Sequence, residues 1–116
     1  MKTENAIRDK SFLFPLRVVK CYKYLQAEQK EFVLSKQFLR SGTAIGALIM
    51  EAEQAQSKAD FVHKLYIALK EANETRYWLE LLHQSGYIDE TGYKSISEDC
   101  KELLKLLTSI IKTSKK

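Results

Sequence analysis

Apolar side chains recur at alternating intervals of four and three residues through most of the chain, and this period constrains the fold more than any other feature. It is the period of a helix that packs one face against a seam. We expect four such helices, over residues 11–27, 30–54, 58–84 and 90–112. Because the linkers are short, we predict a single all-α domain over residues 1–116, an antiparallel up-down-up-down four-helix bundle. The sustained heptad-like period predicts a left-handed bundle.

The turn residues support this interpretation. The chain has one proline and four glycines among 116 residues, too few for a β-sandwich or a barrel. Pro15 suits the first turn of the first helix, where a backbone N–H has no partner within the helix. Ser57, followed by Asp60, indicates an N-cap for the third helix, and Asp89 or Thr91 is expected to cap the fourth.

No segment of the sequence suggests a membrane span or a secretory signal. The longest apolar run, over residues 44–50, is far shorter than the ~20 residues that a spanning helix needs. The first residues are charged and lack an apolar signal segment, so we expect a cytoplasmic protein without membrane contact. Cys21 and Cys100 lack zinc-site or redox spacing, and we expect both to be reduced and buried in the core.

The titratable residues do not form a recognisable catalytic or metal-binding pattern. Glu80 with His83, and Asp60 with His63, have the Glu-x-x-His type of spacing found in di-iron bundles. Both pairs fall on the third expected helix, ~30 Å apart, so they cannot meet within one subunit. We therefore predict no enzymatic activity, no catalytic residue, no metal and no cofactor. The alternative is a metal-dependent enzyme in which neighbouring subunits bring Glu80 and His83 together.

Antiparallel packing of the second and third helices would bring opposite charges to the same height. We predict an ion pair between Arg40 and Glu74 or Glu71, which would set the register of the two helices. Glu51 is expected near His63, toward the other end of the same two helices. Such partly buried pairs contribute to structural specificity more dependably than to stability.

Two glycines lie in the middle of the second helix. Gly42 and Gly46 each cost ~1 kcal/mol relative to alanine at such positions, so a compensating contact is expected. We predict that another helix approaches closely there, within the subunit or from a neighbour. A ligand site is the alternative.

The expected helices carry more apolar surface than one seam requires. A second stripe flanks the first on three of the helices. Its members are Leu39, Thr43, Gly46 and Met50, then Ile67, Glu71, Glu74, Trp78 and Leu81, then Leu104, Leu106 and Ile111. Broad apolar coverage is typical of helices covered by a partner, and we expect a homo-oligomer. A wide core face within one subunit is the alternative.

Basic residues concentrate at the two ends of the sequence and acidic residues in its middle, with a net charge of +4. Five lysines could form one basic strip for phosphates of RNA or DNA. They are Lys20, Lys23, Lys36, Lys105 and Lys112. The basic tail over residues 113–116 is expected to be frayed. Alternatively, the asymmetry is the complementary charge of helices or subunits that pack together.

Two segments, residues 37–52 and 57–82, resemble the bacterial four-helix-bundle family first named for open reading frames in intervening sequences of 23S rRNA genes. The positions that match the family signature are Arg40, Glu51, Glu71, Glu74 and Trp78. The resemblance implies an up-down bundle that assembles into homopentamers. A related branch is the accessory variability determinant of diversity-generating retroelements, a basic pentameric barrel that binds nucleic acid and a reverse transcriptase.

Two positions depart from the family pattern. Ala44 and Leu48 stand where the signature has Ser and Asn, so any polar contact made there is expected to be replaced by apolar packing. We therefore predict a non-enzymatic homo-oligomer, a pentamer by resemblance, with RNA or DNA as a candidate partner. The alternative is an adaptor whose apolar faces meet a different protein, without nucleic-acid binding.

Overall fold

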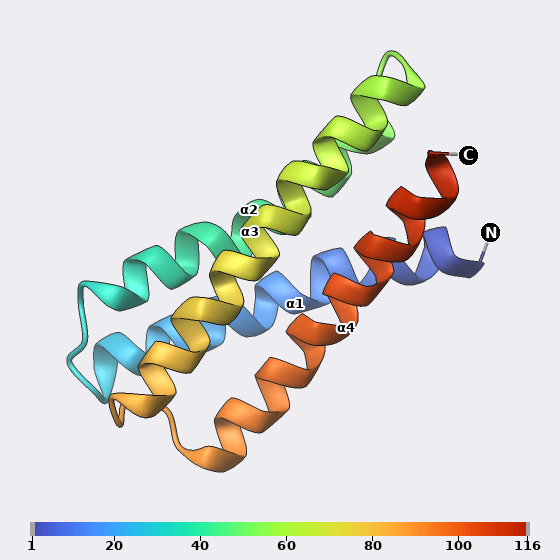
Figure 1. Ribbon diagram of the computed structural model, residues 1–116. Helices are drawn as coiled ribbons and strands as arrows, with labels where there is room; N and C mark the ends of the chain where they lie inside the picture. The colour runs from blue at the N-terminus through green and yellow to red at the C-terminus, as the bar shows by residue number, and fades with distance from the viewer. Residues whose placement is uncertain (1, 116) are drawn as a thin grey trace.

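The computed structural model describes residues 2–115. It contains four helices: α1 over Lys2–Ala27, α2 over Leu34–Glu53, α3 over Lys58–Gln84 and α4 over Glu90–Ser114 (Figure 1). No strand is present between residues 2 and 115. The prediction of an all-α four-helix bundle is confirmed. The left-handed twist stays a prediction.

Neighbouring helices contact each other in opposite residue order. On α2 and α3, Arg40 contacts Glu74 while Glu51 contacts Lys64. The loops over residues 28–33 and 85–89 lie at one end of the molecule, and the loop over 54–57 lies at the other (Figure 1). The start of α1 and the end of α4 lie together, away from the first two loops.

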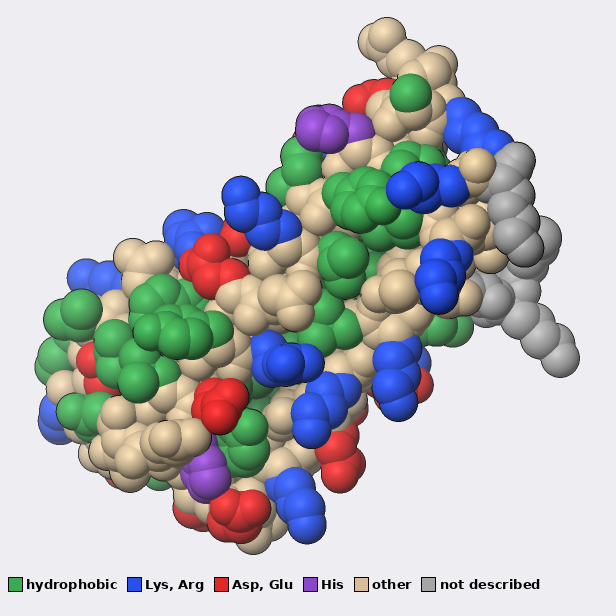
Figure 2. Space-filling model, viewed as in Figure 1, with side chains coloured by type: hydrophobic (Ala, Val, Ile, Leu, Met, Phe, Trp, Pro, Cys, Tyr) green, Lys and Arg blue, Asp and Glu red, His purple; other side chains and the backbone are tan. Residues whose placement is uncertain are grey.

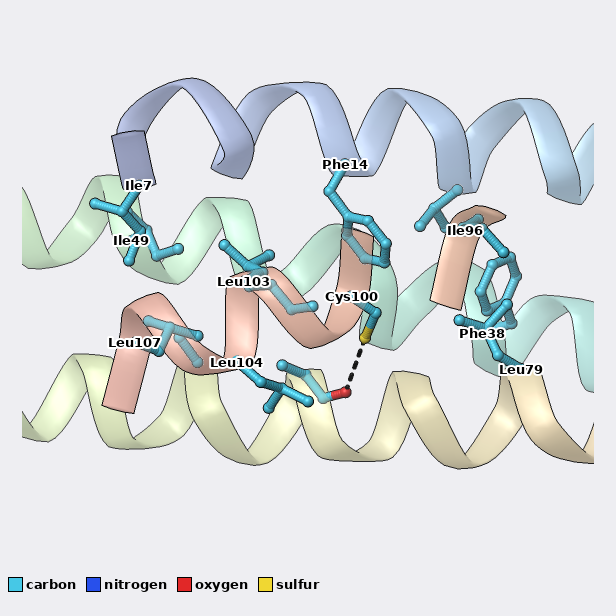
Figure 3. Packing of buried hydrophobic residues seen from close by; sticks show 14 of the residues in the cluster. Ile7, Phe14, Phe38, Ile49, Leu79, Ile96, Cys100, Leu103, Leu104 and Leu107 are labelled. Atoms are coloured by element: carbon cyan, nitrogen blue, oxygen red, sulfur yellow. Dashed lines mark hydrogen bonds between the residues drawn. The ribbon is translucent and has the colours of Figure 1, made fainter. Parts of the chain in front are cut away.

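The core runs along the axis of the bundle and draws on all four helices (Figure 3). Its largest fully buried apolar side chains are Val18, Leu25, Phe38, Ile45, Leu79, Leu82, Leu103 and Leu107. These positions follow the expected stripes, and apolar burial at ~25 cal/mol per Å² supplies the main driving force for packing. Cys100 lies among them, its thiol 3.6 Å from the carbonyl oxygen of Ala72.

The first helix is longer than expected, and this corrects the predicted start at residue 11. Because α1 begins at Lys2, Pro15 lies in the middle of the helix and not in its first turn. A mid-helix proline lacks the N–H that would bond the carbonyl four residues earlier, here that of Ser11. Helix formation therefore continues through the proline with one backbone hydrogen bond missing.

The two mid-helix glycines of α2 face α1 within the same chain. A Cβ atom on Gly42 would lie 2.7 Å from a methyl carbon of Val18. A Cβ on Gly46 would overlap the carbonyl oxygen of Ser11 and lie 3.2 Å from the ring of Pro15. The expected close approach of another helix is thus made by α1, and it explains why glycine is needed at both positions.

The second helix begins four residues later than the predicted residue 30, because a side chain caps it from the preceding loop. The Glu31 carboxylate accepts hydrogen bonds from the backbone N–H groups of Val33, Leu34 and Ser35, at 3.2, 3.0 and 2.7 Å. Lys30 has a φ of 55°, which turns the chain so that Glu31 points inward. The first N–H groups of a helix lack intrahelical partners, and here one buried carboxylate satisfies three of them.

The capping residues of α3 and α4 are among those predicted from the sequence. Ser57 Oγ accepts a hydrogen bond from the N–H of Asp60 at 3.1 Å, and α3 spans the predicted residues. Asp89, one of two expected caps, accepts from the N–H of Gly92 at 2.7 Å. The expectation of a frayed tail over residues 113–116 is wrong in part, because α4 continues to Ser114. Lys116 lies outside the described residues.

Within residues 2–115, no helix is long and apolar enough to cross a membrane.

Both cysteines are free thiols in apolar surroundings. Burial raises the pKa of the Cys100 thiol to about 12, although the nearby Arg76 acts in the opposite direction. Burial likewise raises the pKa of Cys21 to about 11, opposed by Arg17. Cys100 is fully buried, as expected, whereas Cys21 is only half-buried.

Candidate interaction surfaces

An apolar groove runs between α1 and α2, and we call it the α1–α2 groove. Its volume is about 820 Å³. Its walls include Phe12, Leu13, Leu16 and Val19 from α1 and Thr43, Ala47 and Met50 from α2, with Pro15 and Gly46 at its floor. Phe12 is 67% exposed and Met50 is 66% exposed. Large apolar side chains therefore meet solvent along a concave surface.

Charged residues lie at one end of this groove. Arg8, Asp9 and Glu53 also line the groove, and Arg8 Nε lies 3.1 Å from Glu53 Oε1. Arg8 and Glu53 therefore form an ion pair, and Asp9 adds one further carboxylate. The groove thus combines an apolar middle with a charged end.

The sequence only partly located this exposed surface. Of the expected second stripe, Met50 is exposed, but Leu104 and Ile111 are buried in the core of the same chain. Leu39, Trp78 and Leu106 also pack against that core. The exposed residues on α1 were missed. The signal for them was the apolar set Phe12, Leu13 and Leu16, which lies beside the core residues Phe14 and Val18.

A second exposed apolar surface lies on the loop between α1 and α2, and we call it the apolar tip. It consists of Phe32, which is 51% exposed, and Val33, which is 72% exposed. Hydrophobic side chains gather at this end of the molecule in Figure 2. Glu31, only 8% exposed, turns inward beside them. The buried carboxylate therefore fixes the loop in a conformation that presents its neighbours to solvent.

Arg40 contacts both carboxylates named from the sequence. Its guanidinium lies 3.3 Å from Glu71 and bonds Glu74 directly. Glu74 also accepts a hydrogen bond from the indole N–H of Trp78 at 3.0 Å. The half-exposed Arg40 thus joins α2 to two turns of α3, with Glu71 largely buried beneath it.

A pair of hydroxyl groups fixes the same two helices from inside the core, and sequence reasoning missed it. Thr75 Oγ1 lies 2.9 Å from Ser41 Oγ, and both side chains are fully buried. The Thr75 hydroxyl donates to the carbonyl of Glu71 at 2.8 Å. Ser41 and Thr75 lie at positions of the apolar period on their two helices. Only their placement opposite each other could have indicated this hydrogen bond from the sequence.

The expected contact between Glu51 and His63 is wrong. Glu51 pairs instead with Lys64, at 3.2 Å. The height along the helices was predicted correctly, but adjacent residues on a helix point about 100° apart. His63 is exposed, and it lines a shallow depression at that end of α3.

The five candidate lysines do not line a single groove. Lys105 and Lys112 lie in a groove of about 540 Å³ between α3 and α4, together with Arg76. We call this the basic groove. Figure 2 shows Lys and Arg side chains spread over α3 and α4. Arg76 was absent from the sequence prediction because no register between these two helices was assigned.

The other three lysines lie elsewhere on the surface. Lys20 lines a depression between α1 and α4 that also holds Arg17 and Asp89. Lys23 and Lys36 are exposed near the loop between α1 and α2. The predicted strip is therefore divided into a basic groove and a separate group of lysines near the loop end.

Ion pairs also join the first and last helices. Arg17 lies 2.6 Å from Asp99, and Lys10 lies 2.9 Å from Glu102. Because Arg17 also donates to the Ser95 carbonyl, these charges serve contacts between helices. This use matches the alternative that basic and acidic segments pack against each other.

The histidine of the candidate di-iron motif makes a local contact. His83 Nε2 lies 2.9 Å from Glu90, and the imidazole stacks on Tyr93 with ring centres 4.2 Å apart. Among residues 2–115, no group of three His, Cys, Asp or Glu side chains is placed to hold a metal ion. The imidazole thus connects the end of α3 to the start of α4.

The two positions that depart from the family pattern lie on α2. Leu48 packs against the hydrophobic core, and Ala44 is half-buried. Leu48 therefore contributes apolar packing where the family pattern has a polar side chain.

Comparison with known proteins identifies a family and a similar solved structure. The family model described as 23S rRNA-intervening sequence protein matches residues 3–109. A crystal structure of a protein with unknown function, from the S23 ribosomal protein family of Bacteroides thetaiotaomicron, is 63% identical. The match covers 95% of this chain and 98% of that chain, with a TM-score of 0.94. No curated protein matches the chain.

Proposed function

Since the chain belongs to the family of 23S rRNA-intervening sequence proteins, we propose that it is a non-enzymatic bundle that assembles with copies of itself. We further propose that the assembly is a pentamer, following the family resemblance, and that it binds RNA or DNA through basic surfaces repeated around a ring.

The α1–α2 groove is the observation that carries this proposal. Monomeric proteins rarely expose large contiguous apolar patches, and such patches commonly mark protein interfaces. Here Phe12, Leu13, Leu16 and Met50 stand more than 45% exposed around one concave surface. Covering these side chains with a second subunit would remove apolar area from water and stabilise the assembly.

The basic groove supports the nucleic-acid part of the proposal. Arg76, Lys105 and Lys112 converge on one surface, with Asn73 and Thr108 as further hydrogen-bonding groups. Phosphate contacts need basic side chains and no base-reading motif. Three such residues per subunit give weak binding, but the contacts add up when a ring presents the groove several times.

Size-exclusion chromatography with light scattering tests the assembly. We expect a molar mass of several times 13.4 kDa at micromolar concentration. A monomer across the accessible concentration range would overturn the proposed self-association. That result would favour the adaptor alternative, in which the groove receives a different protein.

Anisotropy of a labelled single-stranded RNA, and of a DNA of the same sequence, tests nucleic-acid binding. We expect the logarithm of the affinity to fall linearly with the logarithm of salt concentration. The double variant Lys105→Ala/Lys112→Ala should weaken binding and lower the salt slope by about one for each phosphate that is no longer neutralised.

The matched control is Lys23→Ala/Lys36→Ala, which removes the same charge near the loop end. An equal loss of affinity in both variants would assign the effect to net charge and not to the basic groove. Absence of binding to either nucleic acid at low salt would overturn this part of the proposal.

A further inference from the structure

We propose that the basic groove takes a single strand of RNA or DNA, whose phosphates follow lysines of α4 and whose bases stack on tyrosines of α3. The inference rests on the proposed nucleic-acid binding and specifies the form of the ligand and how it lies. It follows from a difference in chemistry between the two rims of the groove.

The rim on α4 is basic, and we call it the lysine rim. Its residues Lys101, Lys105, Thr108 and Lys112 are exposed, and their spacing of four, three and four places them on one face of the helix. Lys105, Thr108 and Lys112 line the groove itself. At ~1.5 Å per residue the row is ~16 Å long. Figure 2 shows basic side chains along this helix, where they can neutralise successive phosphates of one strand.

The rim on α3 carries aromatic rings, and we call it the tyrosine rim. Its residues Tyr66, Lys70, Asn73 and Tyr77 repeat the spacing of four, three and four. Tyr66 is 43% exposed and Tyr77 is 58% exposed. Asn73 lines the groove, and the Tyr66 hydroxyl accepts a hydrogen bond of 2.9 Å from Lys115, at the end of α4. The two rings therefore border the same groove from the α3 side.

The two rims lie side by side along part of their length. The thiol of Cys100 on α4 lies 3.6 Å from the carbonyl oxygen of Ala72 on α3, which fixes the relative height of these antiparallel helices. Tyr66 and Tyr77 lie on either side of Ala72 along α3, and the two rings span a length that includes the heights of Lys101 and Lys105. A strand that follows the lysines therefore passes both aromatic rings.

The groove keeps a positive excess after the neighbouring carboxylates are counted. Lys70 and Arg76 add two basic groups to the three of the lysine rim. The exposed Glu80 and Glu98 each lie one turn from a basic residue of the same helix, so five basic groups face two acidic ones. Glu102 pairs with α1 instead. Among the described residues, none that lines the groove is acidic, and a polyanion is the complementary ligand.

The tyrosines favour a single strand over a duplex. In a duplex the faces of the bases are stacked on one another, and a protein reaches only their edges. In a single strand these faces are free to stack on aromatic side chains while a basic groove follows the backbone. The Tyr77 ring packs on Trp78 with ring centres 4.9 Å apart, which restrains it for such a contact.

A comparison of two oligonucleotides tests base stacking on the unaltered protein. One is oligothymidine, and the other has the same length and the same phosphates but abasic sugars. We expect about tenfold weaker binding of the abasic strand at equal salt, with a similar salt slope, because only the stacking is lost. Oligothymidine annealed to its complement should also bind more weakly than the single strand.

Variants of Tyr77 test the assigned ring. Tyr77→Leu keeps an apolar side chain but removes the ring, and we expect roughly tenfold weaker binding of oligothymidine with an unchanged salt slope. The abasic strand should bind this variant and the wild type equally. Tyr77→Phe keeps the ring and should retain the affinity. Tyr24→Leu, at a tyrosine of α1 that is 44% exposed, is the matched control and should have no effect.

The outcomes separate this inference from the proposed function. Binding to neither strand at low salt overturns both. Equal affinity for the normal and abasic strands, or for Tyr77→Leu and wild type, overturns the stacking and leaves the basic groove as a phosphate site. A duplex that binds as tightly as the single strand overturns the choice of a single strand. Circular dichroism and light scattering check each variant, and if Tyr77→Leu changes fold or mass, the two strands on the unaltered protein decide.

Discussion

Pro15 of α1 and Gly46 of α2 pack against each other at the floor of the α1–α2 groove. Pro15 leaves the Ser11 carbonyl without its usual backbone partner, and that oxygen faces the Cα of Gly46. Weak Cα–H···O contacts of this kind recur where two helices approach closely. The proline and the glycine therefore form one structural unit, although they are far apart in sequence.

Replacement of Gly46 by alanine tests this relationship. Alanine gains ~1 kcal/mol over glycine in an unobstructed helix interior, so a stabilising effect is the default. Here the added methyl group would overlap the Ser11 carbonyl, and we expect a loss of about 1–3 kcal/mol in the free energy of unfolding. Urea titration followed by circular dichroism measures it. Ala47→Ser, at the exposed neighbouring position, is the control with little expected effect, and a more stable Gly46→Ala protein would contradict the close approach.

Removal of the Arg40 guanidinium should affect both stability and tryptophan fluorescence. Arg40→Leu leaves the largely buried Glu71 without its partner, and because Arg40 is half exposed we expect a loss of about 1 kcal/mol or less. Trp78 is the single tryptophan, and its indole N–H bonds Glu74, so its emission should shift. Arg40→Lys should restore the stability only in part because it lacks the bidentate geometry. Unchanged stability, emission and assembly size in Arg40→Leu would show that the cluster does not set the helix register.

The Glu31 cap should make stability depend on pH. Its folded pKa is lowered, so the ionised cap stabilises the protein above the ordinary glutamate pKa of about 4.3 and loses this effect as pH falls through the folded pKa. We expect Glu31→Gln to cost about 1–2 kcal/mol at pH 7. The difference between variant and wild type should shrink below about pH 4. Urea unfolding at several pH values measures both, and a difference that is independent of pH would argue against a charged cap.

The two thiols should resist modification in the folded protein. Burial raises the pKa of Cys100 to about 12 and that of Cys21 to about 11, so the reactive thiolate is scarce at pH 8. We expect slow reaction with a disulfide reagent in buffer and rapid reaction in denaturant. Cys100→Ala, which retains the half-buried Cys21, should react faster than Cys21→Ala. Equal and rapid labelling of both variants in buffer would contradict the burial.

Local signals in the sequence were sufficient to predict the bounds of some helices and insufficient for others. The bounds of α3 were predicted because Ser57 and Gly86 mark its two ends through short-range hydrogen bonding and backbone conformation. The start of α2 was missed because Glu31 caps it with a long side chain from outside the usual N-cap position. The start of α1 was missed because Pro15 is tolerated in mid-helix next to Gly46.

Contacts between helices were predictable only where a short turn fixes the register. The turn between α2 and α3 placed Arg40 at the height of Glu71 and Glu74, but it did not decide whether Lys64 or His63 meets Glu51. The Arg17 contact with Asp99 joins the first and last helices, and its register depends on all the intervening turns. The shapes of the grooves depend on how far neighbouring helices diverge, and the period of the apolar residues does not predict that divergence.

The placement of the chain ends has a practical consequence. The start of α1 and the end of α4 lie together, away from the loop that carries Phe32 and Val33 (Figure 1). Cyclic symmetry repeats every point of a subunit at one height, so a ring would carry all its chain ends in one circle. Fluorophores or affinity handles fused there would be equivalent to one another and equally spaced around the axis.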